Sequence, residues 1–329
     1  MRSDICIVVV GLGNIARRHR RNLRQLFPES TIVAVSASGR EPQEAVCNAD
    51  KVASSIDAAL AIPSAFAIVA SPASYHYQHA APFINAGVPV LIEKPVVADS
   101  SDAARLQELA RRTNTMVAVA YCLRYLPSTI IAKQLLDAGD IGHIHNALIT
   151  IGQFLPDWRP TTDFRQSVSA RQALGGGVLL ELSHELDYLQ WLLGPQQVLH
   201  AVLRNSRELD LEVEEIADMV MVNTRGTIST LHMDFLQKQA CRRCTFIGSK
   251  ARLEWDLIAN SVTRHSADGT VSCYSQPSWD KNGMYLAMLE DFMAAIAGKP
   301  NNCITLDEAL ATVELIEQIK KMATQGKVQ

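Results

Sequence analysis

The feature that most constrains this chain is a short apolar strand that runs directly into a glycine-rich turn. Residues 5–10 read ICIVVV, and Gly11-x-Gly13-x-x-Ala16 follows at once, ahead of a helical segment. Gly11 permits a sharp turn, Gly13 lets the backbone approach an anion, and the small Ala16 lets the helix pack on the strand. The start of that helix offers free N–H groups and the positive end of its dipole. The pattern therefore predicts a cradle for the pyrophosphate of a dinucleotide.

The rest of the N-terminal third repeats the same alternation of strand and helix. Apolar runs recur at 31–37, 65–71, 88–93 and 116–121, with helical patterns between them. Such alternation is typical of βαβ units with right-handed crossovers. After about residue 122 the segments alternate with the period of antiparallel strands, and one long helix is expected over Leu179–Leu193. We therefore predict an α/β, doubly wound parallel-sheet domain over 1–122 and an α+β domain with a large, mainly antiparallel sheet over 123–329.

Composition and charge exclude several classes of protein. The 329 residues carry a net charge of -3 and are 48% hydrophobic, which is the balance of a soluble globular protein without a nucleic-acid surface. No apolar run reaches the roughly 20 residues of a membrane helix. The seven scattered cysteines fit a reducing cytoplasm, and the lone Cys241-Arg-Arg-Cys244 lacks further ligands, so no metal is expected. The basic cluster at 16–24 is interpreted as a solvated helix face.

The end of the second strand bears on the choice of dinucleotide. An acidic residue at this place normally binds the ribose of NAD, but here Ser36, Ser38 and Arg40 follow the strand and no carboxylate comes before Glu41. This arrangement favours the 2′-phosphate of NADP over NAD. The alternative is that Arg40 is only a solvated loop residue.

The fifth apolar run ends in an unusual triplet, Glu93-Lys94-Pro95. In open α/β sheets ligands lie beyond the carboxyl ends of the strands, and Lys94 stands at such an end. Pro95 disfavours the helical conformation of Lys94, so the lysine is held extended and can face a ligand; the bond between them could be cis. The alternative is a surface lysine that ends a strand.

Several motifs occur together and in a fixed order. They are Gly11-x-Gly13-x-x-Ala16 with His19, SPASYHYQHA (71–80), Glu93-Lys94-Pro95, YCLRYLP (121–127) and GGGVLLELSHELDYLQWLLG (175–194). In this combination the chain resembles the glucose–fructose oxidoreductase / inositol dehydrogenase / MocA family of NAD(P)-dependent dehydrogenases. The resemblance implies a Rossmann domain and a sheet-rich domain whose open face makes homodimers or homotetramers.

The resemblance also implies that Lys94 and His184 line the active site. The family often has an aspartate four residues before this histidine, where the present chain has Leu180, and Glu181 lies three before it. Lys94, His184 and Glu181 are therefore the predicted catalytic residues. On one continuous helix Glu181, His184 and Asp187 would share a face, where a carboxylate could fix the tautomer of the histidine. The alternative for His184 is a core histidine.

These inferences lead to a functional hypothesis with named residues. The chain is expected to transfer a hydride between a nicotinamide and a carbinol or carbonyl carbon of a sugar or nucleotide-sugar, with bacterial surface polysaccharide metabolism as the context suggested by the resemblance. Two alternatives stay open: a cofactor-recycling glycosidase or lyase, and a non-catalytic NADP-sensing regulator. The predicted cofactor-binding residues are Gly11, Gly13, Asn14, Ile15, Ser36, Ser38, Arg40, Ser71, Pro72, His76, Glu93 and Lys94. The predicted substrate-binding residues are Arg124, Tyr125, Trp158, Arg159, Asp163 and Arg165.

Overall fold

The structure is a computed structural model that describes residues 5–36, 38–40, 42, 44–158, 160 and 163–325. The chain divides into two compact units. The first unit contains Met1–Tyr121 together with Tyr285–Val313, and the second contains Cys122–Met284 together with Glu314–Gln329.

The first unit is built on a six-stranded parallel sheet in the order β3-β2-β1-β4-β5-β6. Its strands are β1 (Cys6–Val10), β2 (Thr31–Val35), β3 (Lys51–Ala53), β4 (Phe66–Val69), β5 (Val90–Ile92) and β6 (Val117–Val119), and the helices between them are α1 (Asn14–Leu26), α2 (Ile56–Leu60), α3 (His76–Asn85) and α4 (Ser100–Thr113). The predicted doubly wound sheet is confirmed. The short elements β3 and α2 were not expected from the sequence.

The strand order fixes which helices cover which face of this sheet. From β1 the chain moves outward to β2 and β3, and then returns to β4 and continues to β5 and β6 in the opposite direction. Because crossovers are right-handed, this reversal places α1 on one face and α2, α3 and α4 on the other. It also makes the edge between β1 and β4 a switch point, where ligands of such sheets bind beyond the carboxyl ends of the strands.

A C-terminal segment completes the first unit. Helix α8 (Gly283–Ile296) sets Phe292 edge-on against Phe66 of β4, with ring centroids 5.5 Å apart, and the backbone N–H of Val119 donates to the carbonyl of Ile304. The sequence predicts one domain over the whole of 123–329. Residues 285–313 instead belong with the first unit, because the apolar side of α8 packs on its sheet.

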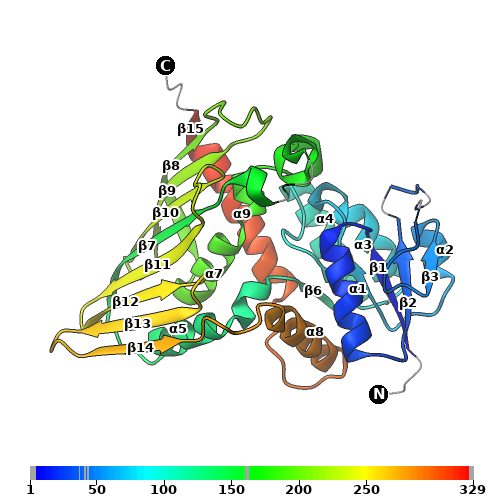
Figure 1. The fold of residues 1–329 in the computed structure, drawn as a ribbon, viewed down its shortest axis with the longest axis horizontal. Helices are drawn as coiled ribbons and strands as arrows, with labels where there is room; N and C mark the ends of the chain where they lie inside the picture. Colours follow the sequence, from blue (N-terminus) through cyan, green and yellow to red (C-terminus); the bar gives the residue numbers. More distant parts are fainter. Residues whose placement is uncertain are drawn as a thin grey trace. The chain divides into compact units, whose positions relative to one another are not determined.

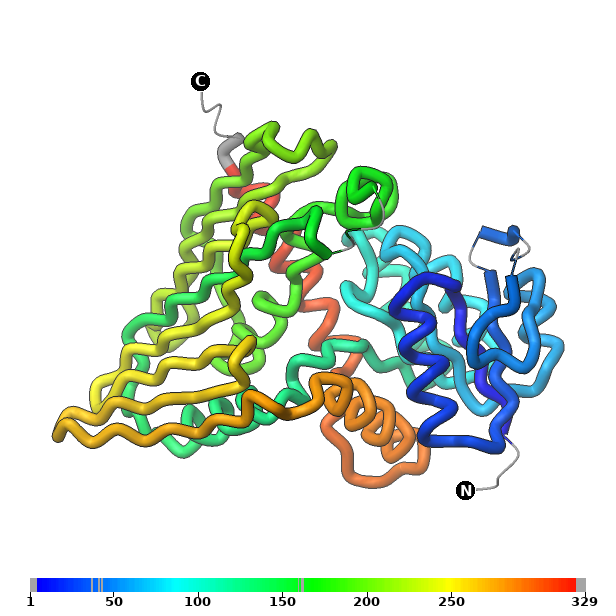
Figure 2. Tube along the Cα trace, in the orientation of Figure 1, coloured from blue at the N-terminus to red at the C-terminus, as the bar shows by residue number. Residues whose placement is uncertain are grey.

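The second unit is built on a nine-stranded sheet, whose strands lie side by side in Figure 2 in the order β14-β13-β12-β11-β7-β10-β9-β8-β15. The strands are β7 (Ile144–Gly152), β8 (Gln196–Arg204), β9 (Ile216–Asn223), β10 (Ile228–Asp234), β11 (Cys241–Gly248), β12 (Ala251–Asp256), β13 (Ser261–Ser266), β14 (Val271–Ser275) and β15 (Ala323–Gln325). Only the β7–β10 and β8–β15 pairs are parallel, so the predicted mainly antiparallel sheet is confirmed.

One face of this sheet is covered by helices. Figure 1 shows α5 (Pro127–Asp137), α7 (His184–Leu193) and the C-terminal part of α9 (Leu306–Met322) along the same face. The strands alternate accordingly: Ala147 and Ile149 of β7 are buried on the helix-covered face, whereas Leu148 between them is 44% exposed on the other face. A strand pattern of period two thus separates a packed face from an open one.

The helix expected over Leu179–Leu193 is wrong, because the structure has two helices there. Helix α6 (Val178–Glu181) ends at Leu182, whose φ of -99° and ψ of 26° leave helical geometry, and α7 begins at His184. Nearly every residue of both helices is buried, so the apolar pattern is continuous and hides the break. Glu181 and His184 therefore belong to different helices. Within the described residues, no helix is long and apolar enough to cross a membrane.

Candidate active site

The glycine turn after β1 has the geometry of a phosphate cradle. Gly11 has a φ of +117°, and a Cβ there would lie 2.5 Å from the carbonyl oxygen of Ala70, so only glycine fits. Gly13, the N-cap of α1, has no atom within 4 Å of where a Cβ would stand. The backbone at Gly13 and the first N–H groups of α1, at Asn14 and Ile15, are thus open to an anion.

The basic cluster at 16–24 is not simply a solvated helix face, as the sequence suggested. Arg20 is only 1% exposed, and its guanidinium donates to the carbonyls of Gly11 (3.0 Å) and Cys47 (3.1 Å). His19 and Asn22 are fully buried as well. Arg20 therefore stabilises the glycine turn by its hydrogen bond to the carbonyl of Gly11. No local sequence pattern identified this role.

The end of β2 places small hydroxyl groups beside this turn. Ser36 is buried, and its Oγ lies 3.4 Å from the Oγ of Ser38, while Arg40 is exposed. A cavity of about 350 Å³ opens nearby and is lined by Leu12, Arg17, Arg20, Pro42, Glu44, Ala45, Val46 and Cys47. Glu41, the first carboxylate after the second strand, lies outside the described residues.

The Glu93-Lys94-Pro95 triplet follows β5 at the carboxyl end of the parallel sheet. Glu93 is buried and accepts a hydrogen bond of 2.7 Å from Nε2 of His19 on α1. A second oxygen of Glu93 lies 3.2 Å from the backbone N–H of Lys94, and the Lys94–Pro95 peptide bond is cis. Glu93, predicted to bind cofactor, thus joins α1 to the strand end and leaves the half-buried Lys94 at the ligand-binding edge.

His76, also predicted to bind cofactor, is a buried connector. Its Nε2 lies 2.7 Å from the carbonyl oxygen of Ser71, and its Nδ1 lies 2.9 Å from that of Pro95. Burial lowers the pKa of His76, so the ring is neutral near pH 7 and donates to one of the two oxygens at a time. His79 approaches the hydroxyl of Ser71 at 2.9 Å. The ring of His76 therefore ties the loop after β4 to the loop that carries Lys94.

In the second unit, His184 occupies the first turn of α7, and the two acidic residues after it serve as anchors. Asp187 is 2% exposed and accepts two hydrogen bonds from the guanidinium of Arg124, at 2.7 and 3.0 Å. Glu185 is fully buried and accepts two from Arg242 of β11, at 2.7 and 2.8 Å. Asp187, three residues after His184 on the same helix, therefore pairs with Arg124, which was predicted to bind substrate.

The remaining predicted residues lie near the 3-10 segments that precede α6. Glu181 accepts from the hydroxyl of Ser169 at 3.1 Å. Trp158 packs edge-on against Phe235, with centroids 5.7 Å apart. Asp163 caps the short helix η4 (Phe164–Gln166) by accepting from the backbone N–H of Arg165. Tyr125 lies in the 3-10 segment η2 (Cys122–Tyr125), and Arg159 lies outside the described residues.

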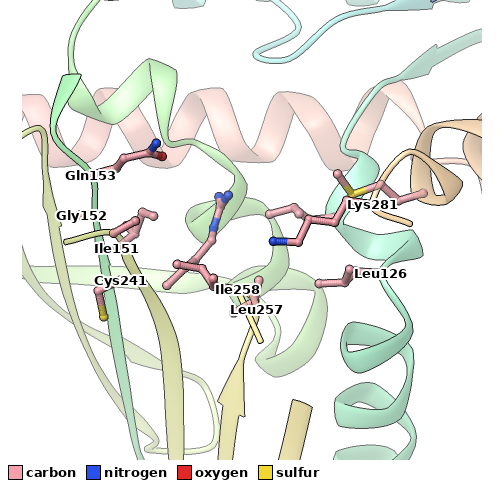
Figure 3. A pocket seen from close by; sticks show the side chains of 12 residues that line it. Leu126, Ile151, Gly152, Gln153, Cys241, Leu257, Ile258 and Lys281 are labelled. Atoms are coloured by element: carbon pink, nitrogen blue, oxygen red, sulfur yellow. The ribbon is translucent and has the colours of Figure 1, made fainter. Parts of the chain in front are cut away.

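A pocket of about 200 Å³ opens within the second unit, which we call the Lys281 pocket. It is lined by Leu123, Leu126, Ile151, Gly152, Gln153, Ala240, Cys241, Arg242, Leu257, Ile258, Lys281 and Met284. Figure 3 shows Gln153, Ile151 and Cys241 on one side and Lys281 on the other, with the nitrogen end of Lys281 directed inward. Neither this pocket nor the pairing of Arg242 with Glu185 was expected from the sequence, in which Cys241-Arg-Arg-Cys244 was considered only as a CxxC motif without further metal ligands.

Together these features are those of an oxidoreductase that uses a dinucleotide cofactor. The first unit holds a dinucleotide cradle with a lysine at the carboxyl end of a neighbouring parallel strand, and the second holds a histidine at the start of a buried helix. A glycine cradle of this geometry is typical of sites that bind the pyrophosphate of a dinucleotide, and lysine and histidine can donate or exchange protons. Lys94 belongs to the first unit and His184 to the second.

Comparison with known proteins identifies the family. Residues 5–121 match the oxidoreductase family with an NAD-binding Rossmann fold that is named GFO_IDH_MocA, and residues 130–254 match the C-terminal domain of the same family. The chain therefore belongs to the GFO/IDH/MocA family of NAD(P)-dependent oxidoreductases. The family resemblance stated from the motifs is confirmed.

Individual relatives are more distant. The chain is 28% identical over 346 residues to dTDP-3,4-didehydro-2,6-dideoxy-alpha-D-glucose 3-reductase of Saccharopolyspora spinosa, covering 98% of this chain and 99% of that enzyme. It is 30% identical over 205 residues to an inositol 2-dehydrogenase of Streptomyces avermitilis, covering 60% of this chain and 56% of the relative. Among solved structures, levoglucosan dehydrogenase in complex with NADH and levoglucosan shares the fold, with a TM-score of 0.84 at 16% identity over 97% of each chain.

Proposed function

We propose that this protein transfers a hydride between a nicotinamide dinucleotide and a carbinol or carbonyl carbon of a sugar or nucleotide-sugar. The observation that carries the proposal is that the cradle at Gly11 and Gly13 is intact and that Lys94 stands at the carboxyl end of β5 in the same sheet. Relatives named as a dTDP-sugar reductase and inositol dehydrogenases support the substrate class. NAD(P), when bound, supplies the hydride acceptor or donor; the chain supplies binding, orientation and proton transfer.

The proposal gives Lys94 and His184 separate roles. His184 takes the hydroxyl proton during oxidation and returns it during reduction, which is the work of a general base and acid near neutral pH. Lys94 donates a hydrogen bond to the reacting oxygen and stabilises the negative charge that develops on it. Glu181, held by the hydroxyl of Ser169, is proposed as a residue that orients the site, in place of the aspartate that relatives often carry.

NADP is the proposed cofactor in preference to NAD. The hydroxyls of Ser36 and Ser38 and the exposed guanidinium of Arg40 offer hydrogen-bond donors and positive charge where a 2′-phosphate would lie. Arg40→Glu should therefore reduce kcat/KM with NADP by about tenfold or more and leave kcat/KM with NAD unchanged or improved. An equal loss with both cofactors would contradict this preference.

The proposed reaction is tested by following reduced nicotinamide absorbance with a panel of sugars and nucleotide-sugars. Lys94→Ala should lower kcat by roughly 10²–10³-fold, the usual effect of losing one donor to a developing oxyanion, while cofactor affinity stays unchanged. Lys51→Ala removes an exposed lysine from the same unit and serves as the control. Unchanged turnover in Lys94→Ala would refute the role of the lysine.

His184→Asn extends the test to proton transfer. The substitution should lower kcat by roughly 10²–10⁴-fold and remove the limb of the pH–rate profile that reports the histidine. A variant that retains the wild-type pH profile would assign proton transfer to another group. Turnover of sugars without net change in NAD(P)H would instead favour the cofactor-recycling glycosidase or lyase.

A further inference from the structure

The walls of the Lys281 pocket are apolar, but its charged groups are all cationic. Leu126, Ile151, Leu257 and Ile258 supply much of the wall, and no aspartate or glutamate lines the pocket. A pocket of this kind fixes a ligand by a few placed polar groups against an apolar surface. The sign of its charge therefore indicates what kind of group it can accept.

Of the two cations, only Lys281 is available to a ligand. The positive charge of Arg242 is neutralised by the carboxylate of Glu185, which accepts two hydrogen bonds from the guanidinium. Lys281 makes no hydrogen bond or ion pair with the described part of the chain, and the carboxylate of the preceding Asp280 accepts instead from the backbone N–H of Asn282. Figure 3 shows the nitrogen end of Lys281 directed into the pocket rather than away from it.

We propose that the Lys281 pocket binds an anionic group of the substrate, a carboxylate or a phosphate, through the ammonium of Lys281. The amide of Gln153 lies across the pocket and supplies a second donor. This inference rests on the proposed function, because it names the substrate class of that same reaction as an acidic or phosphorylated sugar.

The pocket is connected to His184 within the second unit. Arg242 lines the pocket, and its guanidinium is bonded to Glu185, the residue next to His184 in the first turn of α7. A substrate anchored by its anionic group is therefore held at a set distance from the proposed acid–base residue. Such anchoring by a remote group is how binding energy orients a reacting centre.

The test is a binding experiment with the full-length protein saturated with NADP. Calorimetric titrations would use D-glucose, D-glucuronate and D-glucose 6-phosphate as neutral, carboxylate and phosphate probes. The wild type should bind at least one anionic probe about tenfold or more tightly than glucose, and added salt should reduce the difference. Comparison of the two anions shows which group the pocket takes.

Two substitutions decide the role of the lysine. Lys281→Gln should abolish the preference for the anion and leave glucose affinity unchanged, whereas Lys250→Gln, at an exposed lysine of the same unit that does not line the pocket, should keep it. Absence of an anion preference in the wild type, or its survival in Lys281→Gln, would overturn the proposal. Binding is measured without turnover, so the two proposals can fail separately. If the protein oxidises sugars but shows no preference for the anionic probes, only the anion-binding role of this pocket is refuted. If it prefers the anionic probes but oxidises no sugar, only the proposed reaction is refuted.

Discussion

The ion pair between the fully buried Glu185 and the part-buried Arg242 makes the sharpest prediction about the second unit. Glu185 is fully buried and receives both of its strong hydrogen bonds from Arg242. Burial alone would lower the pKa of Arg242, but the charge and hydrogen bonds of Glu185 outweigh burial and raise it. Arg242→Met would keep the packing and leave the carboxylate without its cation, a change that costs roughly 3–5 kcal/mol when one partner of a buried pair is lost.

The double variant Glu185→Gln/Arg242→Met separates charge from packing. It removes both charges, and the glutamine can still accept from the hydroxyl of Tyr188, which lies 3.3 Å from Glu185. The double variant should therefore be less destabilised than Arg242→Met alone, with a coupling energy of roughly 1–3 kcal/mol.

Urea unfolding followed by tryptophan fluorescence measures this cost in the right unit. All four tryptophans, at 158, 191, 255 and 279, belong to the second unit, so their signal reports its unfolding. The midpoint should fall in Arg242→Met while the m-value stays constant. A loss below about 1 kcal/mol, or a double variant as unstable as the single one, would refute the reasoning from a buried uncompensated charge.

Three further predictions follow from other parts of the molecule. His232 lies between Asp234 and Asp218, and their hydrogen bonds raise its pKa from 6.5 to about 9. Because the pKa of His232 is higher in the folded than in the unfolded protein, its stabilisation is complete below about pH 6.5 and is lost as the pH rises through 9. Partial exposure reduces this stabilisation to about 1–2 kcal/mol. His232→Asn should therefore flatten the dependence of the free energy of unfolding on pH between pH 6 and 10, and an unchanged slope would exclude this residue as the cause. Gly11→Ala should abolish dinucleotide binding measured by fluorescence titration, since its Cβ would meet the carbonyl of Ala70, and retained affinity would show that the turn can relax. Light scattering should give the mass of a homodimer or homotetramer, and a monomer mass would contradict the state that the family resemblance implied.

The parts predicted well from the sequence are those where topology forces residues together. Parallel strands end at the same edge of a sheet, so the strand before Gly11 and the strand before Glu93 placed their polar residues on that edge without any knowledge of contacts. The alternation of apolar and polar residues after about residue 122 likewise predicted the mainly antiparallel second sheet. Both inferences use only the period of the hydrophobic pattern and the order of strands and helices, which can be read directly from the sequence.

The parts that could not be predicted depend on partners far apart in the chain. His19 meets Glu93 across 74 positions, and Arg242 meets Glu185 across 57. No periodicity links such residues, and a buried arginine looks the same as an exposed one in a basic run, as Arg20 shows. The break between α6 and α7 was hidden for a related reason: helices that are buried on nearly all sides have no polar face to mark where one ends.

In both the Glu93-Lys94-Pro95 triplet and the segment that begins at His184, the contacts show that the acidic residues have a structural role. In Glu93-Lys94-Pro95 the acid is bonded to His19, and in the segment after His184 both Glu185 and Asp187 are bonded to arginines of other elements. The carboxylates thus fix the backbone next to Lys94 and His184. Counting the charged residues of either motif therefore overstates the number of groups that can take part in proton transfer. Substitutions of these acids should first change stability and the position of the neighbouring basic residue, and substitutions of the basic residues should first change turnover.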